Sequence, residues 1–169
     1  IRKAGNTLAW GPVFEQYFQE IDKVKGQKGV LSVEKKLFVE TNNGTNRQIR
    51  PVTPEQPLRI GDKVIVRLTI RTDREMNYVF LKDLRAGCFE PADQLSGPES
   101  RDGIWYYRSP KDVSENFFIN RLPEGTFVLE YPVYVSRSGE YAGGISTIQC
   151  MYAPEFVSHT AGESLRIMP

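Results

Sequence analysis

The fold is indicated most clearly by one ten-residue stretch, KVIVRLTIRT, at positions 63–72. Every second residue from Val64 to Ile70 is apolar, and arginine or threonine occupies most of the positions between them. Alternation with a period of two is typical of a strand that buries one face and leaves the other largely wet. Gly61 and Asp62 supply a turn immediately before it. The stretch therefore predicts a β-strand at residues 63–72.

The same alternation recurs at hairpin-like intervals on both sides of this stretch. Residues 126–136 are apolar on one face from Phe127 to Val135, and Pro132 on the other face lacks an N–H donor, which predicts an edge or a bulge there. Weaker strand patterns occur at residues 31–39, 78–84, 104–108, 116–120, 144–152 and 164–167. Eight or nine short strands separated by turns predict an all-β fold, an antiparallel β-sandwich.

Three segments leave their structure open. The apolar residues of Val13–Val24 are spaced for one face of a helix, whereas the alternation around Trp10–Phe18 also permits a strand. Residues 41–56 are polar and predict either a long hairpin or a loop. Residues 88–103 show little periodicity and predict a long loop.

Composition places the chain among globular domains. Its 169 residues and mass of 19.3 kDa suit one domain, and 40% hydrophobic with 25% charged residues exclude disordered, collagen-like and coiled-coil classes. No apolar run is long enough for a membrane helix, and no signal segment opens the chain. Because the first residue is Ile1 rather than Met, we expect the chain to be part of a longer protein.

Charge and residue usage exclude several kinds of chemistry. With 22 basic and 21 acidic residues, the chain has no basic excess of the kind that nucleic-acid binding requires. One histidine, His159, and two cysteines are too few for a zinc or histidine-based metal site, and the acidic residues lack the spacing of a calcium loop. We therefore predict no catalytic residue, no cofactor and no metal. A small carboxylate hydrolase remains an alternative, because sequence spacing does not show whether carboxylates converge in a cleft.

The two cysteines, Cys88 and Cys150, stand 62 positions apart. They form either a disulfide, which an oxidising compartment would favour, or two buried free thiols.

Aromatic residues gather at Trp105, Tyr106 and Tyr107. An exposed row of rings on a β-sandwich would suit a carbohydrate-binding module, which is an alternative function for the chain. Adjacent strand residues point to opposite faces, however, so at least one of these rings should pack in the core.

The stretch QCMYAPEF at residues 149–156, followed by Ser158, His159 and Gly162, is the most specific motif of the chain. It resembles the end of the last macroglobulin-like domain of bacterial alpha-macroglobulins. Other stretches that resemble Bacteroidetes-type members of that family are residues 10–18, 61–74, 78–86, 88–91, 106–112 and 122–126. The resemblance covers almost the whole chain, in order.

The resemblance implies a single C-terminal macroglobulin-like domain over residues 1–169, with a fibronectin type III or immunoglobulin-like fold. Residues 1–28 would then be a connecting strand or helix from the preceding domain. It further implies that the chain is a non-catalytic module of a larger peptidase inhibitor. That parent protein would be exported and would be a lipoprotein in the periplasm or at the cell surface. The expected partners are the other domains of the parent, including a thioester domain if it has one, and peptidases reached through the parent.

The same resemblance bears on two short motifs. Cys88-Phe89-Glu90-Pro91 is close to the thioester motif of the family but has Pro91 in place of the required glutamine, so no internal thioester can form here. In related proteins the Met-Tyr pair packs against the thioester region. The resemblance therefore implies that Met151, Tyr152, Pro154 and Glu155 are interface residues, and that Pro154 fixes the turn that presents them.

Overall fold

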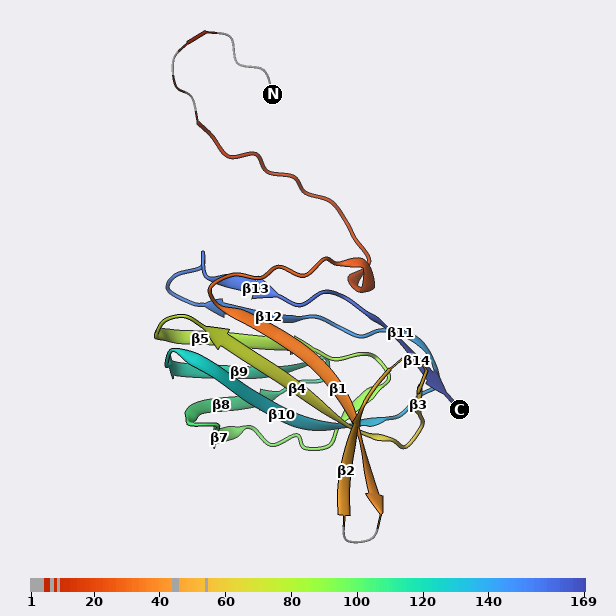
Figure 1. Ribbon diagram of the computed structural model, residues 1–169. Coiled ribbons are helices and arrows are strands. Elements are labelled where there is room, and N and C mark those ends of the chain that lie inside the picture. The colour runs from red at the N-terminus through yellow and green to blue at the C-terminus, as the bar shows by residue number, and fades with distance from the viewer. Residues whose placement is uncertain (1–4, 7, 9, 44–45, 54) are drawn as a thin grey trace.

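The chain folds as a β-sandwich in a computed structural model that describes residues 5–6, 8, 10–43, 46–53 and 55–169 (Figure 1). Two large sheets face each other, with strand orders β2-β1-β4-β10-β6 and β13-β12-β5-β9-β8-β7. A small sheet, β11-β14-β3, lies at one end. Among the described strands, every pairing is antiparallel except that of β14 with β3. The predicted fold class is confirmed.

The five-stranded sheet is formed by β1 (Ser32–Asn43), β2 (Asn46–Pro51), β4 (Lys63–Thr72), β10 (Gly125–Val135) and β6 (Phe89–Pro91). The six-stranded sheet is formed by β13 (Val157–His159), β12 (Ser146–Cys150), β5 (Met76–Leu84), β9 (Ser114–Leu122), β8 (Ile104–Pro110) and β7 (Gly97–Arg101). The small sheet is formed by β11 (Gly139–Ala142), β14 (Ser164–Met168) and β3 (Leu58–Arg59). A 3-10 turn, η1 (Ile21–Lys23), precedes the strands.

The two strongest sequence patterns form the centre of the five-stranded sheet. Strand β4 has the bounds predicted for it, and β10 pairs with it so that Leu129 lies opposite Leu68. The alternate apolar residues of both strands are buried, as predicted. Pro132 lies opposite Ile65 of β4, and its carbonyl accepts a hydrogen bond at 3.3 Å from the amide of Ala92, the residue after β6. Pairing with β6 begins at Val133, so Pro132 lies at the end of the free edge that β10 has before that residue.

Residues 88–103 differ from the expected long loop, because β6 and β7 lie within them. Strand β6 has only three residues, and β7 has no buried residue. Both strands are therefore recognised by their pairing with β10 and β8 and not by a sequence pattern of their own. Of the two alternatives for residues 41–56, the hairpin agrees with the structure: β2 pairs antiparallel with β1 from Phe38↔Pro51 to Asn43↔Asn46, and the two strands extend beyond the body of the sandwich (Figure 1).

The helix predicted as one alternative at Val13–Val24 is wrong. Residues 10–20 run as an extended, irregular segment that leads away from the sandwich, and within the predicted range only Ile21–Lys23 are helical, as the 3-10 turn η1 (Figure 1). Val13 and Tyr17, which would have formed the apolar stripe, are 72% and 69% exposed. A short helix needs a surface on which to bury its apolar face, and nothing in the described part of the chain covers this one.

A fully buried carboxylate, Asp83 of β5, links the two large sheets. The Lys35 ammonium of β1 donates to it at 2.8 Å, and the Ser146 hydroxyl of β12 donates at 2.7 Å. The Tyr131 hydroxyl of β10 is a third donor. Burial, together with the neighbouring Asp83 carboxylate, raises the pKa of Tyr131 well above its usual value, so the hydroxyl keeps its proton and remains a donor.

A second buried carboxylate, Glu115 of β9, lies between two guanidinium groups. Arg108 donates to it at 2.7 Å and Arg85 at 3.1 Å. Arg85 also donates to the carbonyls of Lys111 and Asp112, which tie the β8–β9 turn to the end of β5. Buried charges of this kind are tolerated because each has partners within hydrogen-bond distance.

We predict that Asp83→Asn lowers the free energy of unfolding by about 3–5 kcal/mol, because it leaves the buried Lys35 ammonium without a counter-charge. Urea denaturation followed by circular dichroism measures this. Glu75→Gln, which breaks an exposed pair with Arg121, is the control and should leave the midpoint almost unchanged. Equal effects of the two substitutions would contradict a structural role for the buried pair.

Candidate functional site

The outer face of the six-stranded sheet carries aromatic side chains on three adjacent inner strands, β5, β9 and β8. Strand pairing places Phe80 of β5 opposite Phe118 of β9, and Phe118 opposite Tyr107 of β8. The Phe80 and Phe118 rings are stacked, with centroids 4.9 Å apart. The ladder continues to Gln149 of β12 on one side and Pro98 of β7 on the other. One row thus crosses five strands without a charged residue.

A second row lies beside the first along the strands. It includes Trp105 of β8, Tyr78 of β5, and Met151 and Tyr152 in the turn that follows β12. The Tyr78 and Tyr152 rings meet edge to face, 5.1 Å apart. We use the term outer aromatic face for both rows together, that is Tyr78, Phe80, Trp105, Tyr107, Phe118, Met151 and Tyr152.

The outer aromatic face is exposed. Trp105 is 71% exposed, Tyr152 81% and Met151 55%, and Phe80 is the most buried of the seven. Large side chains without charge are seldom gathered on a free surface of a soluble domain, and such patches usually mark binding sites.

The expected sugar platform of three adjacent rings is partly wrong. Tyr106 points into the core and is 5% exposed, because neighbours along a strand face opposite ways. Its hydroxyl donates to Glu99 at 3.0 Å, and burial raises the pKa of Tyr106 to about 12. Trp105 and Tyr107 do lie together outside, on the same face as Met151 and Tyr152.

The turn that carries Met151 and Tyr152 is closed by backbone hydrogen bonds. The Cys150 amide donates to the Phe156 carbonyl at 3.0 Å, and the Phe156 amide donates to the Ala153 carbonyl at 3.0 Å. Pro154 and Glu155 lie exposed between these residues. The four residues expected at an interface are therefore together on one turn, and all four are exposed.

The disulfide expected as one alternative is not formed: Cys88 and Cys150 are both free and buried. Cys150 lies opposite Val79, near the start of β5, whereas Cys88 follows the other end of that strand. The length of β5 separates them, so a bridge would require a different fold. The other alternative, two buried thiols, agrees with the structure.

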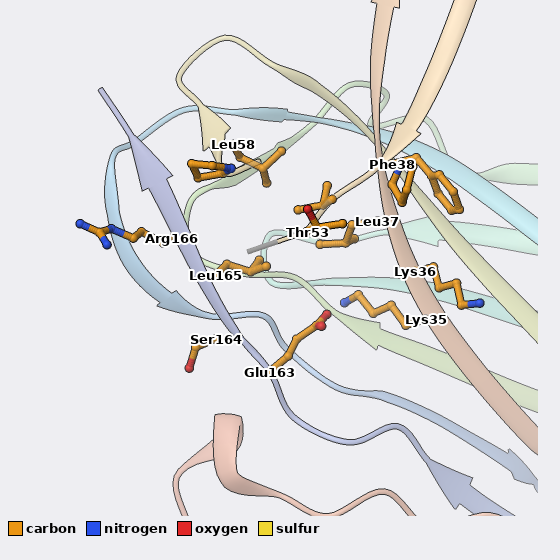
Figure 2. Close-up of a pocket in the computed structure, with 13 residues that line it drawn as sticks. Lys35, Lys36, Leu37, Phe38, Thr53, Leu58, Glu163, Ser164, Leu165 and Arg166 are labelled. Atoms are coloured by element: carbon orange, nitrogen blue, oxygen red, sulfur yellow. The ribbon is translucent and has the colours of Figure 1, made fainter. Parts of the chain in front are cut away.

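A cavity of about 570 Å³ opens between β1, β14 and β3 (Figure 2). Leu37, Leu58 and Leu165 line its apolar part, and Lys36 and Arg166 stand at its rim. Of the described residues that line it, Glu163 is the one carboxylate, so this cavity does not contain the carboxylate pair that a hydrolase would need.

Other kinds of site find little support in the part of the chain that the structure describes. No group of three His, Cys, Asp or Glu side chains there is placed to hold a metal ion. His159 has its Nδ1 3.1 Å from the Thr160 carbonyl oxygen, and so lies against backbone. No described helix is long and apolar enough to cross a membrane.

The sequence predicted Met151, Tyr152, Trp105 and Tyr107 as candidate residues but did not find Tyr78, Phe80 and Phe118. The sequence contains a pattern that could have identified Phe80 and Phe118. Each of these phenylalanines lies between two apolar residues of its strand, so it occupies a position where a half-buried strand normally has a polar side chain.

The family described as bacterial alpha-2-macroglobulin MG10 domain matches residues 31–155. Among solved structures, the chain is similar to Salmonella alpha-2-macroglobulin reacted with methylamine, with 21% identity, a TM-score of 0.67 and 86% of this chain covered. It is also similar to native alpha-2-macroglobulin from Escherichia coli spanning domain MG7 to the C-terminus, with 16% identity, a TM-score of 0.65 and 85% covered. A curated protein, circularly permutated Ras protein 2 of Dictyostelium discoideum, is 28% identical over 109 residues, 64% of this chain.

The chain spans a small part of each of these proteins. It covers 10% of the Salmonella chain, 24% of the Escherichia coli chain and 3% of the Dictyostelium protein. At these identities the structural matches establish a common fold.

We predict that both thiols are titratable in the unfolded, unreduced chain and that neither reacts readily in the folded chain. Burial raises the pKa of Cys88 to about 11, so only about one thiol in a thousand is the reactive thiolate at pH 8. Alkylation of folded Cys88 should therefore keep rising with pH up to about 11, as mass spectrometry of the labelled peptide would reveal. An unfolded chain with no free thiols would contradict the structure.

Proposed function

The chain belongs to the bacterial alpha-2-macroglobulin MG10 domain family, and we propose that it is a non-catalytic docking domain of a protease-trapping protein. In this proposal the outer aromatic face packs against another domain of the same parent. The domain does no chemistry of its own, and its role is to hold the trap in its native arrangement.

The observation that carries the proposal is the exposed, uncharged surface formed by the outer aromatic face. A patch of seven large side chains is costly to leave in water, and its burial against another domain would release that cost. The chain corresponds to only a small share of each similar protein. A parent of comparable length would therefore contain other domains, one of which could bury the outer aromatic face.

Met151 and Tyr152 are the proposed anchors of this contact. Tyr152 offers a large ring with a hydroxyl at its end, and Met151 offers a flexible side chain that adapts to an irregular surface. Both side chains are exposed on their turn, so a partner could reach them directly. Pro154 and Glu155 would complete the contact from the same turn, and Pro154 would also restrict its backbone.

If the parent carries a thioester, we propose that the turn shields it from water. The thioester itself would lie in another domain, because Pro91 stands where the motif starting at Cys88 would need glutamine. We also propose that the parent is exported to the periplasm or cell surface as a lipoprotein, and that it inhibits peptidases.

The segment before β1 fits a connecting role. Residues 10–20 are extended, and Trp10, Phe14 and Phe18 are each at least 89% exposed. We propose that residues 1–28 link this domain, the C-terminal one of a Bacteroidetes-type parent, to the domain before it.

Sugar binding is a second candidate, because Trp105 and Tyr107 are exposed on one side of β8. It would use rings at the end of the outer aromatic face remote from Met151. Binding of soluble oligosaccharides to the isolated chain, lost in Trp105→Ala and kept in Met151→Ala, would favour it over docking.

We predict that hydroxyl-radical footprinting gives a several-fold lower oxidation rate for Met151 and Tyr152 in the full-length parent than in the isolated 169-residue chain. Burial at a domain interface protects both side chains from the radical. Tyr134, on the opposite sheet and 44% exposed, is the internal control. Equal rates for Met151 in the two samples would refute docking through this turn.

In a parent that has a thioester, we predict that Met151→Ala combined with Tyr152→Ala speeds the reaction of the native protein with methylamine. The substitutions remove the side chains that would exclude water and small amines. Thiol release over time measures the rate, and Tyr134→Ala serves as the control. An unchanged rate in the double variant would contradict shielding of the thioester. It would not bear on docking, which the footprinting experiment tests separately.

A further inference from the structure

Tyr78 is a backbone outlier within β5. Its φ is +55°, in the left-handed region that bulky residues rarely adopt. Asp102, with φ +54°, is the other such non-glycine residue in the described chain, and it is explained by the tight turn with Gly103 between β7 and β8. No turn explains Tyr78, because Asn77 and Val79 on either side of it both pair with β9.

Hydrogen bonds join the backbone around Tyr78 to the turn that carries the proposed anchors. The Met151 amide donates to the Tyr78 carbonyl at 2.9 Å, and the Cys150 thiol donates to the Asn77 carbonyl at 3.3 Å. The Tyr78 ring meets Tyr152 edge to face. The conformation thus places both the carbonyl and the ring of Tyr78 against the Met151–Tyr152 turn.

These residues surround a hollow on the outer aromatic face. It has a volume of about 260 Å³ and is lined mainly by Tyr78, Phe80, Phe118, Met151 and Tyr152. An apolar cavity of about 150 Å³ is enough to hold a benzene molecule. The hollow therefore has room for one large apolar side chain, and its mostly apolar lining offers no charge to a polar one.

We infer that this hollow is a socket for a single apolar side chain, aromatic or aliphatic, from another domain of the parent chain, and that Tyr78 is held in its strained conformation to form it. The inference rests on the proposed docking function and adds to it a defined occupant and a residue that the sequence motif does not include. Strained residues persist where the surrounding structure holds them, and they concentrate at binding sites.

The strain is tested with a pair of variants of the 169-residue chain, Tyr78→Gly and Tyr78→Ala. Both remove the ring, but only alanine keeps the Cβ atom that disfavours the left-handed region. We expect the glycine variant to melt about 2–4 °C above the alanine variant. In an ordinary extended strand the order is the reverse, because glycine is there the less stable residue. Alanine melting higher would overturn the claim that Tyr78 is strained.

The socket is tested in the full-length parent by footprinting Met151 in the same two variants. Loss of one wall of the socket should raise the oxidation rate of Met151 several-fold in both variants. Tyr134→Ala, a tyrosine of similar exposure on the opposite sheet, is the matched control and should have no effect.

The outcomes separate the two proposals. If Met151 is protected in the wild-type parent but the Tyr78 variants leave its rate unchanged, docking stands and the socket fails. If Met151 is unprotected in the wild-type parent, both fail. If the isolated chain protects Met151 at high concentration through self-association, the occupant is a second copy and the inference is overturned.

Discussion

The buried Asp83 carboxylate determines which way the six-stranded sheet faces. Asp83 points inward because Lys35 and Tyr131, which come from the opposite sheet, are its partners. Side chains alternate along a strand, so an inward Asp83 requires Leu81 and Val79 to point inward and Phe80 to point outward. A slip of one residue would reverse every side chain of β5 and would place a carboxylate in water and a phenylalanine ring in the core. The position of the outer aromatic face therefore depends on an interaction inside the sandwich.

The outer aromatic face gives the domain two apolar surfaces where a free β-sandwich needs one. The inner surface is buried between the sheets, and the outer one is unpaired in the isolated chain. Tyr78 adds a local strain to the same region. Both features lower the stability of the chain on its own, and both are understandable if the native environment of the domain is the interior of a larger assembly.

The sequence predicted those strands whose pattern is local. Alternation with one buried face identified β4 and β10 almost to the residue, because every second side chain of each strand is buried and those between are mostly not. Strands β6 and β7 were missed, since β6 is only three residues long and β7 buries none of its side chains, so neither has an apolar face for the sequence to reveal. The helical stripe at Val13–Val24 was misleading, because periodicity predicts a helix only when another surface buries it.

From the sequence alone the β-sandwich, its two central strands and the Met151–Tyr152 motif could be determined, because alternation and short motifs are properties of neighbouring residues. The tertiary structure decided what depends on strands far apart in the chain. It separated Cys88 from Cys150 by the length of β5, and it turned Tyr106 inward while leaving Trp105 outside. It also joined the proposed sugar platform and the proposed interface into one surface, since β5, β8, β9 and β12 become neighbours only when the sheet forms.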